Sequence, residues 1–330
     1  MTNVARTVFV VVLCICLLVP AAGAQDALAR WLQPAVERLG AGLPGHTVVS
    51  FGTITYADKK VGSSFSRYLE ETLAAFLARD GRFELFPRDQ LDAILMAQEL
   101  NVSDLVDQKA VVPLGKMKDI QALLSGTFFE AGAEVKVFLE LLSVGKATVI
   151  ARAEAAIPRT LIPSSVSILP DNYNDALYVL EQLASVQGTI GGSLEVKAWN
   201  VRGDGGVYRD GEKLVVNFYA SRACFVKVYH VDAQGKTQLI FPNQFLRDNA
   251  LKAGRIYRIP DSSYPFTFDL GAPYGTEFIK VVASTTQFTD IEAAFTDMGK
   301  VTRGTVSRGL VVTGVDTQVA EATFSYTILN

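Results

Sequence analysis

The chain has 330 residues, with 31 basic and 34 acidic side chains and a formal net charge of −3 at pH 7. The charges are well mixed, and no basic run of the kind that binds nucleic acid or anionic lipid occurs. Cys14, Cys16 and Cys224 are the three cysteines and His46 and His230 the two histidines, which argues against a cysteine–histidine metal site.

The first 24 residues are typical of a secretory signal peptide. Arg6 precedes an apolar run over residues 8–19, and Ala22-Gly23-Ala24 forms an A-x-A cleavage site before Gln25. Neither cysteine of this segment follows a small residue at the end of the run, which argues against acylation. We therefore expect a protein exported to the periplasm or cell envelope that starts near Gln25. It would not span the membrane after cleavage, and Cys224 would be its single cysteine.

The next 134 or so positions read as an N-terminal helix followed by one compact α/β domain. Residues 25–45 hold a short amphipathic helix that Pro34 is expected to interrupt. Residues 46–158 have the pattern β-α-β-α-α-β-β-β. The expected strands are 46–56, 83–86, 122–130, 135–143 and 148–157, and the expected helices follow Gly62-Ser63-Ser64, Pro87 and about Gln108.

Residues 81–95 (GRFELFPRDQLDAIL) are dense in charged side chains and raise the question of a catalytic site. Asp89 is expected to cap the helix after Pro87, and Asp92 to lie at its third position, where carboxylates accept backbone N–H bonds. The Arg88 guanidinium is expected to bond a carbonyl or carboxylate while its stem covers apolar surface. This pattern predicts a strand-to-helix joint rather than a catalytic site.

The second half of the chain changes from helical to strand periodicity. Residues 159–193 predict a Pro-rich linker with one helix and a flexible GTIGGS joint at 188–193. Residues 194–330 alternate with period two and have tight Gly/Asp turns, with one short helix expected at 290–299. The expected strands are LEVKAWN, KLVVNFYA, CFVKVYHV, TQLIF, EFIKVVAS and AEATFSYTIL. The fold class is therefore α+β with two domains, a compact α/β sandwich followed by an all-β immunoglobulin-like sandwich.

The sequence offers little catalytic chemistry. The motifs G-x-S-x-G and H-E-x-x-H do not occur. Ser143-Val144-Gly145-Lys146 matches S-x-x-K, but that chemistry needs a helix and these residues are expected in a hairpin turn. Cys224 opens a strand, where a half-buried apolar role is expected. The segment 203–212 (GDGGVYRDGE) has the composition of hairpin turns. We predict no catalytic residue, no metal site and no cofactor.

Several positions of the first domain follow a known family pattern. The matching residues are Gly81-Arg82-Phe83, Arg88, Leu91, Ile94, Leu95 and the strand glycine Gly126. In these residues the segment 46–157 resembles the CsgG/FlgO-like group of bacterial envelope proteins, which includes the LpoB-type peptidoglycan-synthase activators. The resemblance implies a non-catalytic scaffold. Lipoprotein members of the group use an acylated cysteine, which is not expected here.

The C-terminal segment resembles an uncharacterised bacterial β-sandwich family appended to envelope and signalling proteins. The features that carry this resemblance are Tyr208-Arg209-Asp210-Gly211-Glu212, Phe241-Pro242-Asn243, Tyr257-Arg258-Ile259-Pro260 and the strand at 279–284. The resemblance implies a fold and no activity. The structural or interaction candidates from the whole sequence are Arg88, Asp89, Gly126, Tyr208, Arg209 and Asp210.

The expected function is that of a non-enzymatic periplasmic scaffold that docks to a cell-envelope assembly of flagellar or outer-membrane type. One alternative is a regulator of peptidoglycan synthesis, and another is a hydrolase with an unrecognised carboxylate pair. Two acids that converge in a deep pocket would favour the hydrolase. The expected partners are envelope proteins and not nucleic acid, and self-association stays open.

Overall fold

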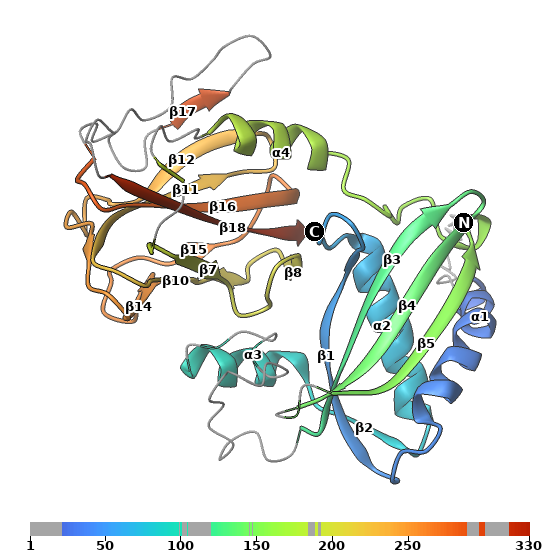
Figure 1. Ribbon diagram of the computed structural model, residues 1–330. Coiled ribbons are helices and arrows are strands. Elements are labelled where there is room, and N and C mark those ends of the chain that lie inside the picture. The colour runs from blue at the N-terminus through green and yellow to red at the C-terminus, as the bar shows by residue number, and fades with distance from the viewer. Residues whose placement is uncertain are drawn as a thin grey trace, which may run out of the picture.

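The computed structural model describes residues 22–98, 100, 104, 120–144, 146, 148–183, 189–190, 193–288, 297–300 and 317–330. The predicted signal peptide up to residue 21 and the predicted helical piece at 108–117 lie outside these residues. Helices and strands are both abundant, as expected for an α+β protein (Figure 1). Within the described residues no helix combines the length and the apolar character that crossing a bilayer requires.

The N-terminal half is built on a five-stranded mixed sheet in the order β2-β1-β3-β4-β5. β1 pairs in parallel with both β2 and β3, whereas β3, β4 and β5 form an antiparallel meander. The strands are β1 (Thr47–Tyr56), β2 (Phe83–Leu85), β3 (Ala122–Ala131), β4 (Glu134–Ser143) and β5 (Val149–Pro158). All five expected strands are thus present within a few residues of their predicted bounds.

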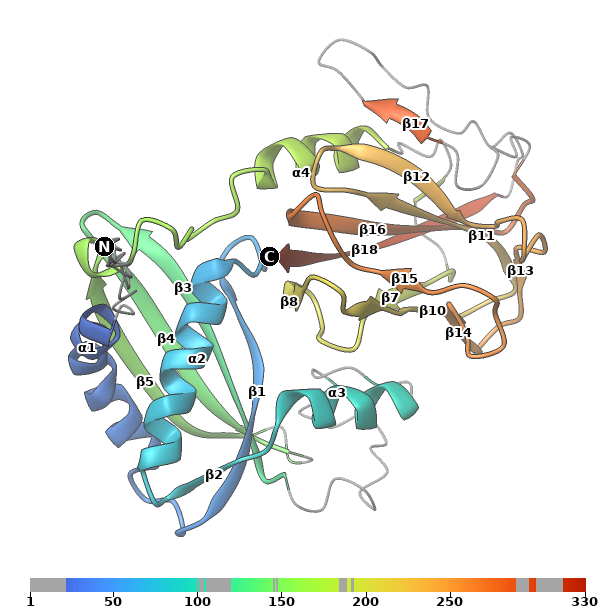
Figure 2. The same cartoon turned by 180° about the vertical axis from the view of Figure 1, so that it is seen from behind.

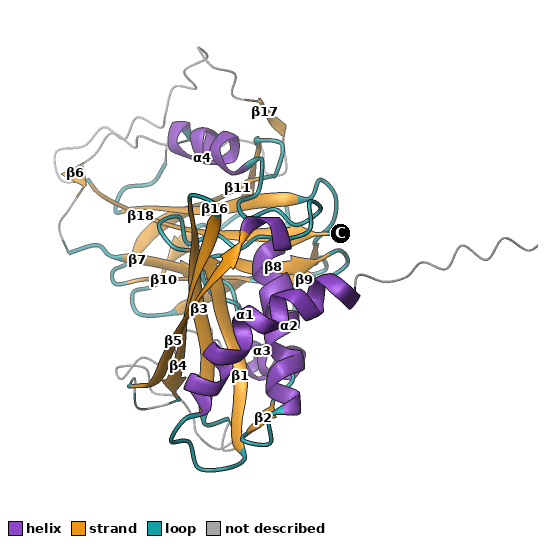
Figure 3. Cartoon of the chain, turned by 90° about the vertical axis from the view of Figure 1, so that its right-hand side faces the viewer, coloured by secondary structure: helices purple, strands orange, loops and turns teal. Residues whose placement is uncertain are grey.

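Two helices cover one face of this sheet, α1 (Ala22–Gly40) and α2 (Ser64–Arg79) (Figure 2). Seen edge on, both lie on the same side of the strands (Figure 3). α2 begins at a capping box, in which the Ser63 side chain accepts from the Ser66 backbone and the Ser66 side chain accepts from the Ser63 backbone in return. Its stripe from Phe65 to Leu77 is buried against the sheet as predicted.

The prediction that Pro34 interrupts the first helix is wrong, because α1 continues through it. A proline inside a helix costs about 3 kcal/mol through the lost N–H bond and the ring clash. On both sides of Pro34 the helix buries Leu28, Leu32 and Leu39 completely. Each fully buried leucine contributes roughly 1.5–3 kcal/mol, so packing against the sheet outweighs the defect.

The C-terminal half consists of two main sheets with a core between them. One has the order β14-β10-β7, and the other has the order β17-β12-β11-β16-β18-β6, with β8 paired to β18 and β13 to β11. Buried residues of both sheets, among them Phe218 and Phe324, form one cluster. The strands are β6 (Thr189–Ile190), β7 (Val196–Trp199), β8 (Gly206–Arg209), β9 (Lys213–Leu214), β10 (Val216–Ala220), β11 (Cys224–Val231), β12 (Lys236–Phe241), β13 (Ala250–Leu251), β14 (Ile256–Ile259), β15 (Phe268–Asp269), β16 (Gly275–Ser284), β17 (Asp297–Lys300) and β18 (Gln318–Leu329).

The six expected strands of this half all appear, and the turn glycines Gly203, Gly205, Gly211 and Gly235 have positive φ as hairpin turns require. The immunoglobulin-like class stays a prediction. The helix expected at 290–299 is wrong for its last three residues, which belong to β17 and pair with β12. The remaining residues of that helix lie outside the described part of the chain.

The segment predicted as a linker contains α4 (Tyr173–Gln182), after a short 3-10 turn at Arg159–Leu161. α4 packs on the C-terminal half, where Tyr173 and Val179 join a buried cluster with Val231 and Phe278. At the expected GTIGGS joint, Thr189 and Ile190 form β6 and pair with β18. The apolar face of α4 therefore attaches this helix to the sheet that follows it in sequence.

Candidate functional site

Arg88 begins α3 (Arg88–Ala97) at the point where β2 stops pairing with β1. Beyond this point the register of β1 shifts between Phe51 and Ile54. The Arg88 guanidinium donates to the carbonyl oxygens of Phe51 at 2.6 Å and Gly52 at 2.8 Å. It thus satisfies two carbonyls at the irregular part of β1, in agreement with the expectation of a carbonyl partner for Arg88.

The helix cap predicted at Asp89 is wrong. Pro87 is the N-cap of α3 and makes no side-chain cap bond, so Asp89 lies inside the first turn and is exposed. Proline fixes a backbone conformation that already suits a helix start, and no carboxylate is needed for it. Asp92 is buried and accepts from Arg88 Nε at 2.8 Å rather than from a backbone N–H.

The second oxygen of Asp92 reaches the other half of the molecule. Arg202, in the turn between β7 and β8, donates from Nε to Asp92 Oδ2 at 2.7 Å and from Nη2 to Glu212 Oε1 at 2.7 Å. Its plane lies 4.3 Å from the centre of the Tyr208 ring. Burial alone lowers the pKa of Arg202, but the Glu212 bond and the Asp92 charge outweigh it and raise the pKa above its ordinary value. Arg88, Asp92, Arg202 and Glu212 form a continuous chain of charge-assisted bonds, which we call the junction chain.

Further contacts close the junction between the halves. The backbone approaches most closely at Gly62 and Gly205, where a Cβ on Gly62 would overlap the Gly205 carbonyl oxygen. Thr327 donates to the Gly62 carbonyl at 2.8 Å, and Ser325 donates to the Lys60 carbonyl at 3.3 Å. At the end of α3, the Arg258 guanidinium donates to a carbonyl of the last turn. α3 therefore lies between the two halves and bonds to both (Figure 1).

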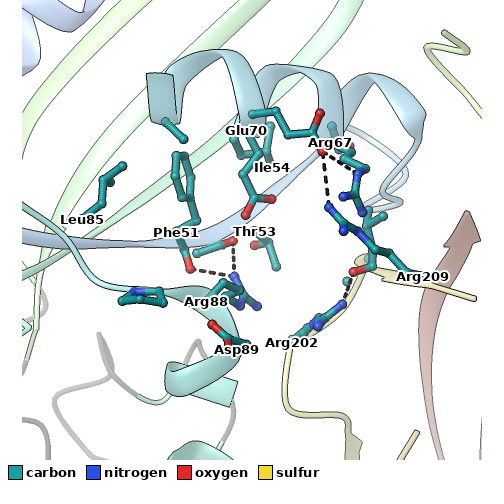
Figure 4. A pocket seen from close by; sticks show the side chains of 18 of the residues that line it. Phe51, Thr53, Ile54, Arg67, Glu70, Leu85, Arg88, Asp89, Arg202 and Arg209 are labelled. Carbon is teal, nitrogen blue, oxygen red and sulfur yellow. Dashed lines mark hydrogen bonds and ion pairs between the residues drawn. The ribbon is translucent and has the colours of Figure 1, made fainter. Parts of the chain in front are cut away.

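A cavity of about 450 Å³ lies at this junction. Its inner walls are the β1 backbone at residues 51–54 and one face of α2, and the C-terminal half closes it with residues 205–207, Arg209 and Glu212. Arg67 and Arg209 bond the same oxygen of Glu71, at 2.8 Å and 3.5 Å (Figure 4). The charged side chains that line the cavity are Arg67, Glu70, Glu71, Arg88, Asp89, Arg202, Arg209 and Glu212.

Glu70 differs from the other charged side chains of the cavity. Its carboxylate points into the space between Phe51, Thr53 and Arg88, and no dashed line reaches it (Figure 4). Burial raises the pKa of Glu70, while the charges of Arg88, Arg202 and Arg67 lower it and that of Asp92 raises it. An acid in this position has no hydrogen bond or ion pair from any described residue.

The predicted site residues fall in four places. Arg88, Asp89 and Arg209 line the cavity. Tyr208 is buried beside it, donates to Asn200 Oδ1 at 3.0 Å, and burial raises its pKa. Asp210 lies in the exposed turn after β8, where its backbone N–H bonds the Leu329 carbonyl. Gly126 lies in β3, away from the cavity, where a Cβ would come within 2.8 Å of the Phe138 carbonyl oxygen.

Sequence reasoning missed Glu70 and Arg202. Glu70 lies on α2, where the apolar stripe was enough to predict a helix and gave no role to Glu70. Arg202 lies in a turn that was predicted from its glycines alone. Asp92 and Arg202 are 110 positions apart, so no local spacing signals their contact. The adjacent Gly203–Gly206 stretch predicted the turn but gave no sign that Arg202 would contact Asp92.

A second cluster lies in the C-terminal half. His230 Nε2 is 2.8 Å from Glu277 Oε2, and the Tyr326 hydroxyl donates to the same oxygen at 2.6 Å. They line a cavity of about 320 Å³ with Asp232 and Phe268. Burial and the Glu277 charge raise the pKa of Tyr326. The second Glu277 oxygen accepts from the Ala233 backbone at 3.4 Å, so the cluster satisfies its own hydrogen-bonding groups.

The outer face of the five-stranded sheet, opposite α1 and α2, carries no described helix (Figures 1 and 2). Phe129 and Phe138 stack on it with ring centres 5.9 Å apart, and Phe138 is 39% exposed. Ile150 follows on β5 with 42% exposure. Ion pairs between Lys136 and Glu134 and between Arg152 and Glu140 flank this apolar area. We call Phe129, Phe138 and Ile150 with these ion pairs the outer sheet surface.

Comparisons with known proteins find one family model and several solved structures. Residues 207–287 match a family model described as a domain of unknown function, DUF4384. No curated protein matches the chain. Among solved structures, the LpoB C-terminal domains from Salmonella enterica and Escherichia coli each match at 16% identity and TM-score 0.32, covering 41% of this chain and 98% of theirs. Lipoprotein GNA1162 from Neisseria meningitidis matches at 18% identity and TM-score 0.25, covering 44% and 100%.

These matches bear on the expected resemblances to different extents. The C-terminal expectation of a family without an assigned activity is confirmed in that coarse form over residues 207–287. The LpoB and lipoprotein matches are similarities of low score. The finer CsgG/FlgO assignment of the N-terminal half stays a prediction.

Proposed function

We propose that this chain is a non-enzymatic accessory protein of the cell envelope, exported to the periplasm, that docks onto an envelope assembly of flagellar or outer-membrane type. The observation that carries the proposal is the outer sheet surface. An aromatic pair flanked by ion pairs has the composition of a protein-binding surface, because apolar anchors provide affinity and the flanking charges provide orientation.

The edge strand β5 specifies the kind of partner. β5 is ten residues long, and among the described elements only β4 pairs with it. An exposed strand edge offers a row of free backbone groups to another chain. We therefore commit to an extended segment of an envelope protein, added as a strand beside β5, with its side chains against Phe138 and Ile150.

The junction supports a scaffold role by a second route. Asp92 is the most buried acid near the cavity, and each of its oxygens is held by an arginine. Both oxygens of this carboxylate are already occupied by arginines and would have to give up those bonds to contact a substrate. This is the reason for preferring a scaffold over the hydrolase alternative, in which Glu70 and Asp92 would act as a carboxylate pair.

Regulation of peptidoglycan synthesis remains the alternative among binding functions. It rests on the Arg88, Leu91, Ile94 and Leu95 pattern, which resembles that of LpoB-type activators. The two binding functions use the same kind of surface and differ in the partner. A peptidoglycan synthase captured at the outer sheet surface would favour the alternative.

The test is site-specific crosslinking in the native envelope from a photoreactive residue at position 138, followed by binding of the purified partner to variants. Phe138→Ser should weaken binding at least about tenfold, the loss expected for a central interface aromatic. Phe245→Ser is the matched control, because Phe245 is 48% exposed in the C-terminal half. Equal binding by both variants, or a crosslinked partner that does not bind the purified protein, contradicts the proposal.

A further inference from the structure

The junction cavity separates opposite charges in space. Inside it, the Glu70 carboxylate faces the open volume without a hydrogen bond from the described residues (Figure 4). Arg67 on α2 and Arg209 at the end of β8 share one oxygen of Glu71 between them. Two guanidinium groups carry about ten N–H donors in total, far more than a single carboxylate can accept. The cavity thus holds an acid without a hydrogen bond, and Arg67 and Arg209 provide spare cationic donors.

The two arginines of the inner wall are already compensated. Arg88 bonds two carbonyls and Asp92, and Arg202 bonds Asp92, Glu212 and the Val207 carbonyl. The junction chain therefore forms a saturated wall that a ligand cannot engage without breaking bonds between the halves. Glu70, Arg67 and Arg209 keep unused hydrogen-bonding capacity, as does Asp89, which is exposed to solvent.

We propose that the junction cavity binds a small zwitterion, an amino acid or short peptide with free termini, with its ammonium group beside Glu70 and its carboxylate against Arg67 and Arg209. The volume of about 450 Å³ lies in the range of small-molecule sites. Phe51 and Phe86 supply apolar surface for the part of the ligand between its charges.

Ligands with a single charge fit this arrangement less well. An anion would place its charge near Glu70, and a cation without an acid group would lie near four arginines. The ammonium group of a ligand with both charges would form an ion pair with Glu70, which reduces the free-energy cost of burying this carboxylate without a hydrogen bond. Its carboxylate would accept from the spare guanidinium donors. Arginine and carboxylate form paired hydrogen bonds, so Arg67 and Arg209 should favour a planar carboxylate.

The experiment is isothermal titration calorimetry of the full mature chain with three probes: alanyl-alanine, N-acetyl-alanyl-alanine and alanyl-alanine amide. Alanyl-alanine should bind, and each blocked form should bind at least about tenfold more weakly, which corresponds to the loss of one charged contact. The proposal is overturned if none of the probes binds at millimolar concentration, or if the acetylated and free dipeptides bind equally.

Variants test which side chain binds each end of the ligand. Glu70→Gln should weaken alanyl-alanine at least about tenfold and leave the acetylated probe unaffected, whereas Arg209→Gln should remove the preference for the free carboxylate over the amide. Glu154→Gln, on exposed β5, is the matched control and should bind as the wild type does. Unchanged binding in Glu70→Gln would overturn the proposal.

This inference stands independently of the docking proposal. Phe138→Ser should lose the protein partner and still bind alanyl-alanine, because Phe138 lies on β4 and does not line the cavity. Glu70→Gln should show the reverse pattern. Each of the two proposals can therefore fail without the other.

Discussion

Glu70 should make the ligand-free protein less stable as the pH rises. Burial is the largest cause of its raised pKa, against its usual value of 4.5, while Arg88, Arg202 and Arg67 oppose the shift and Asp92 adds to it. The folded state therefore holds the Glu70 proton more tightly than the unfolded state. The stabilisation is complete below about pH 4.5 and is lost as the pH rises through the folded-state pKa.

The melting temperature of wild type and Glu70→Gln, measured from about pH 4 to about pH 8, tests this prediction. The amide of the variant carries no charge at any of these pH values, so the difference between the two proteins should move in favour of the variant as the pH rises. A difference that stays constant with pH would mean that Glu70 has the same pKa folded and unfolded.

Arg88→Lys should lower the free energy of unfolding by about 1.5–3 kcal/mol, because an ammonium group cannot reach two carbonyls and a carboxylate in fixed planar geometry. Arg79→Lys on the exposed end of α2 provides the control and should change it by less than about 0.5 kcal/mol. Urea unfolding measures both values. Equal effects would show that the Arg88 bonds contribute no more than a surface charge.

Local chemistry explains which single residues could be predicted. Arg88 follows a strand that ends at Pro87, and the expectation of a carbonyl or carboxylate partner needed only that local context. Asp89 was misassigned because a proline can start a helix without a carboxylate cap. Glu70 and Arg202 acquire their roles from the approach of distant segments, which no short window of sequence contains.

The starts of α2 and α3 allow a comparison between a helix with a side-chain cap and one without. Ser63 accepts a backbone N–H and is buried, so Ser63→Ala should cost about 0.5–2 kcal/mol. Asp89 makes no cap bond, so Asp89→Ala should cost less than about 0.5 kcal/mol, a part of its favourable interaction with the helix dipole. Chemical denaturation of both variants gives the comparison. A larger loss in Asp89→Ala would restore the capping role that the sequence suggested.

The sequence predicted the helices and strands that have strong periodicity. It did not predict which strands pair with each other. Period two and tight turns placed β11, β16 and β18 within a few residues. The parallel pairing of β8 with β18 joins Gly206 to Tyr326, far later in the chain, and depends on the packing of the whole half. α4 was recognised as a helix, but its attachment to Phe278 depends on a strand that follows roughly a hundred residues later.

The two halves should unfold together. The sequence predicted two domains with a flexible GTIGGS joint between them, which would let each fold alone. The junction chain, the Gly62–Gly205 approach and the bonds of Thr327 and Ser325 to the first half favour coupled unfolding instead. These contacts join segments from both ends of the sequence. Loss of the C-terminal half would expose these groups to water and leave Asp92 with Arg88 alone.

Differential scanning calorimetry of the full mature chain should therefore show one transition. Arg202→Gln removes the ion pairs to Asp92 and Glu212, which should cost about 2–5 kcal/mol at an interface and split the transition into two. Arg222→Gln is the control, because its partners Ser193 and Gln318 both belong to the C-terminal half. Two transitions in the wild type would show that the halves fold independently. A single transition in Arg202→Gln at the wild-type temperature would show that the junction chain does not couple them.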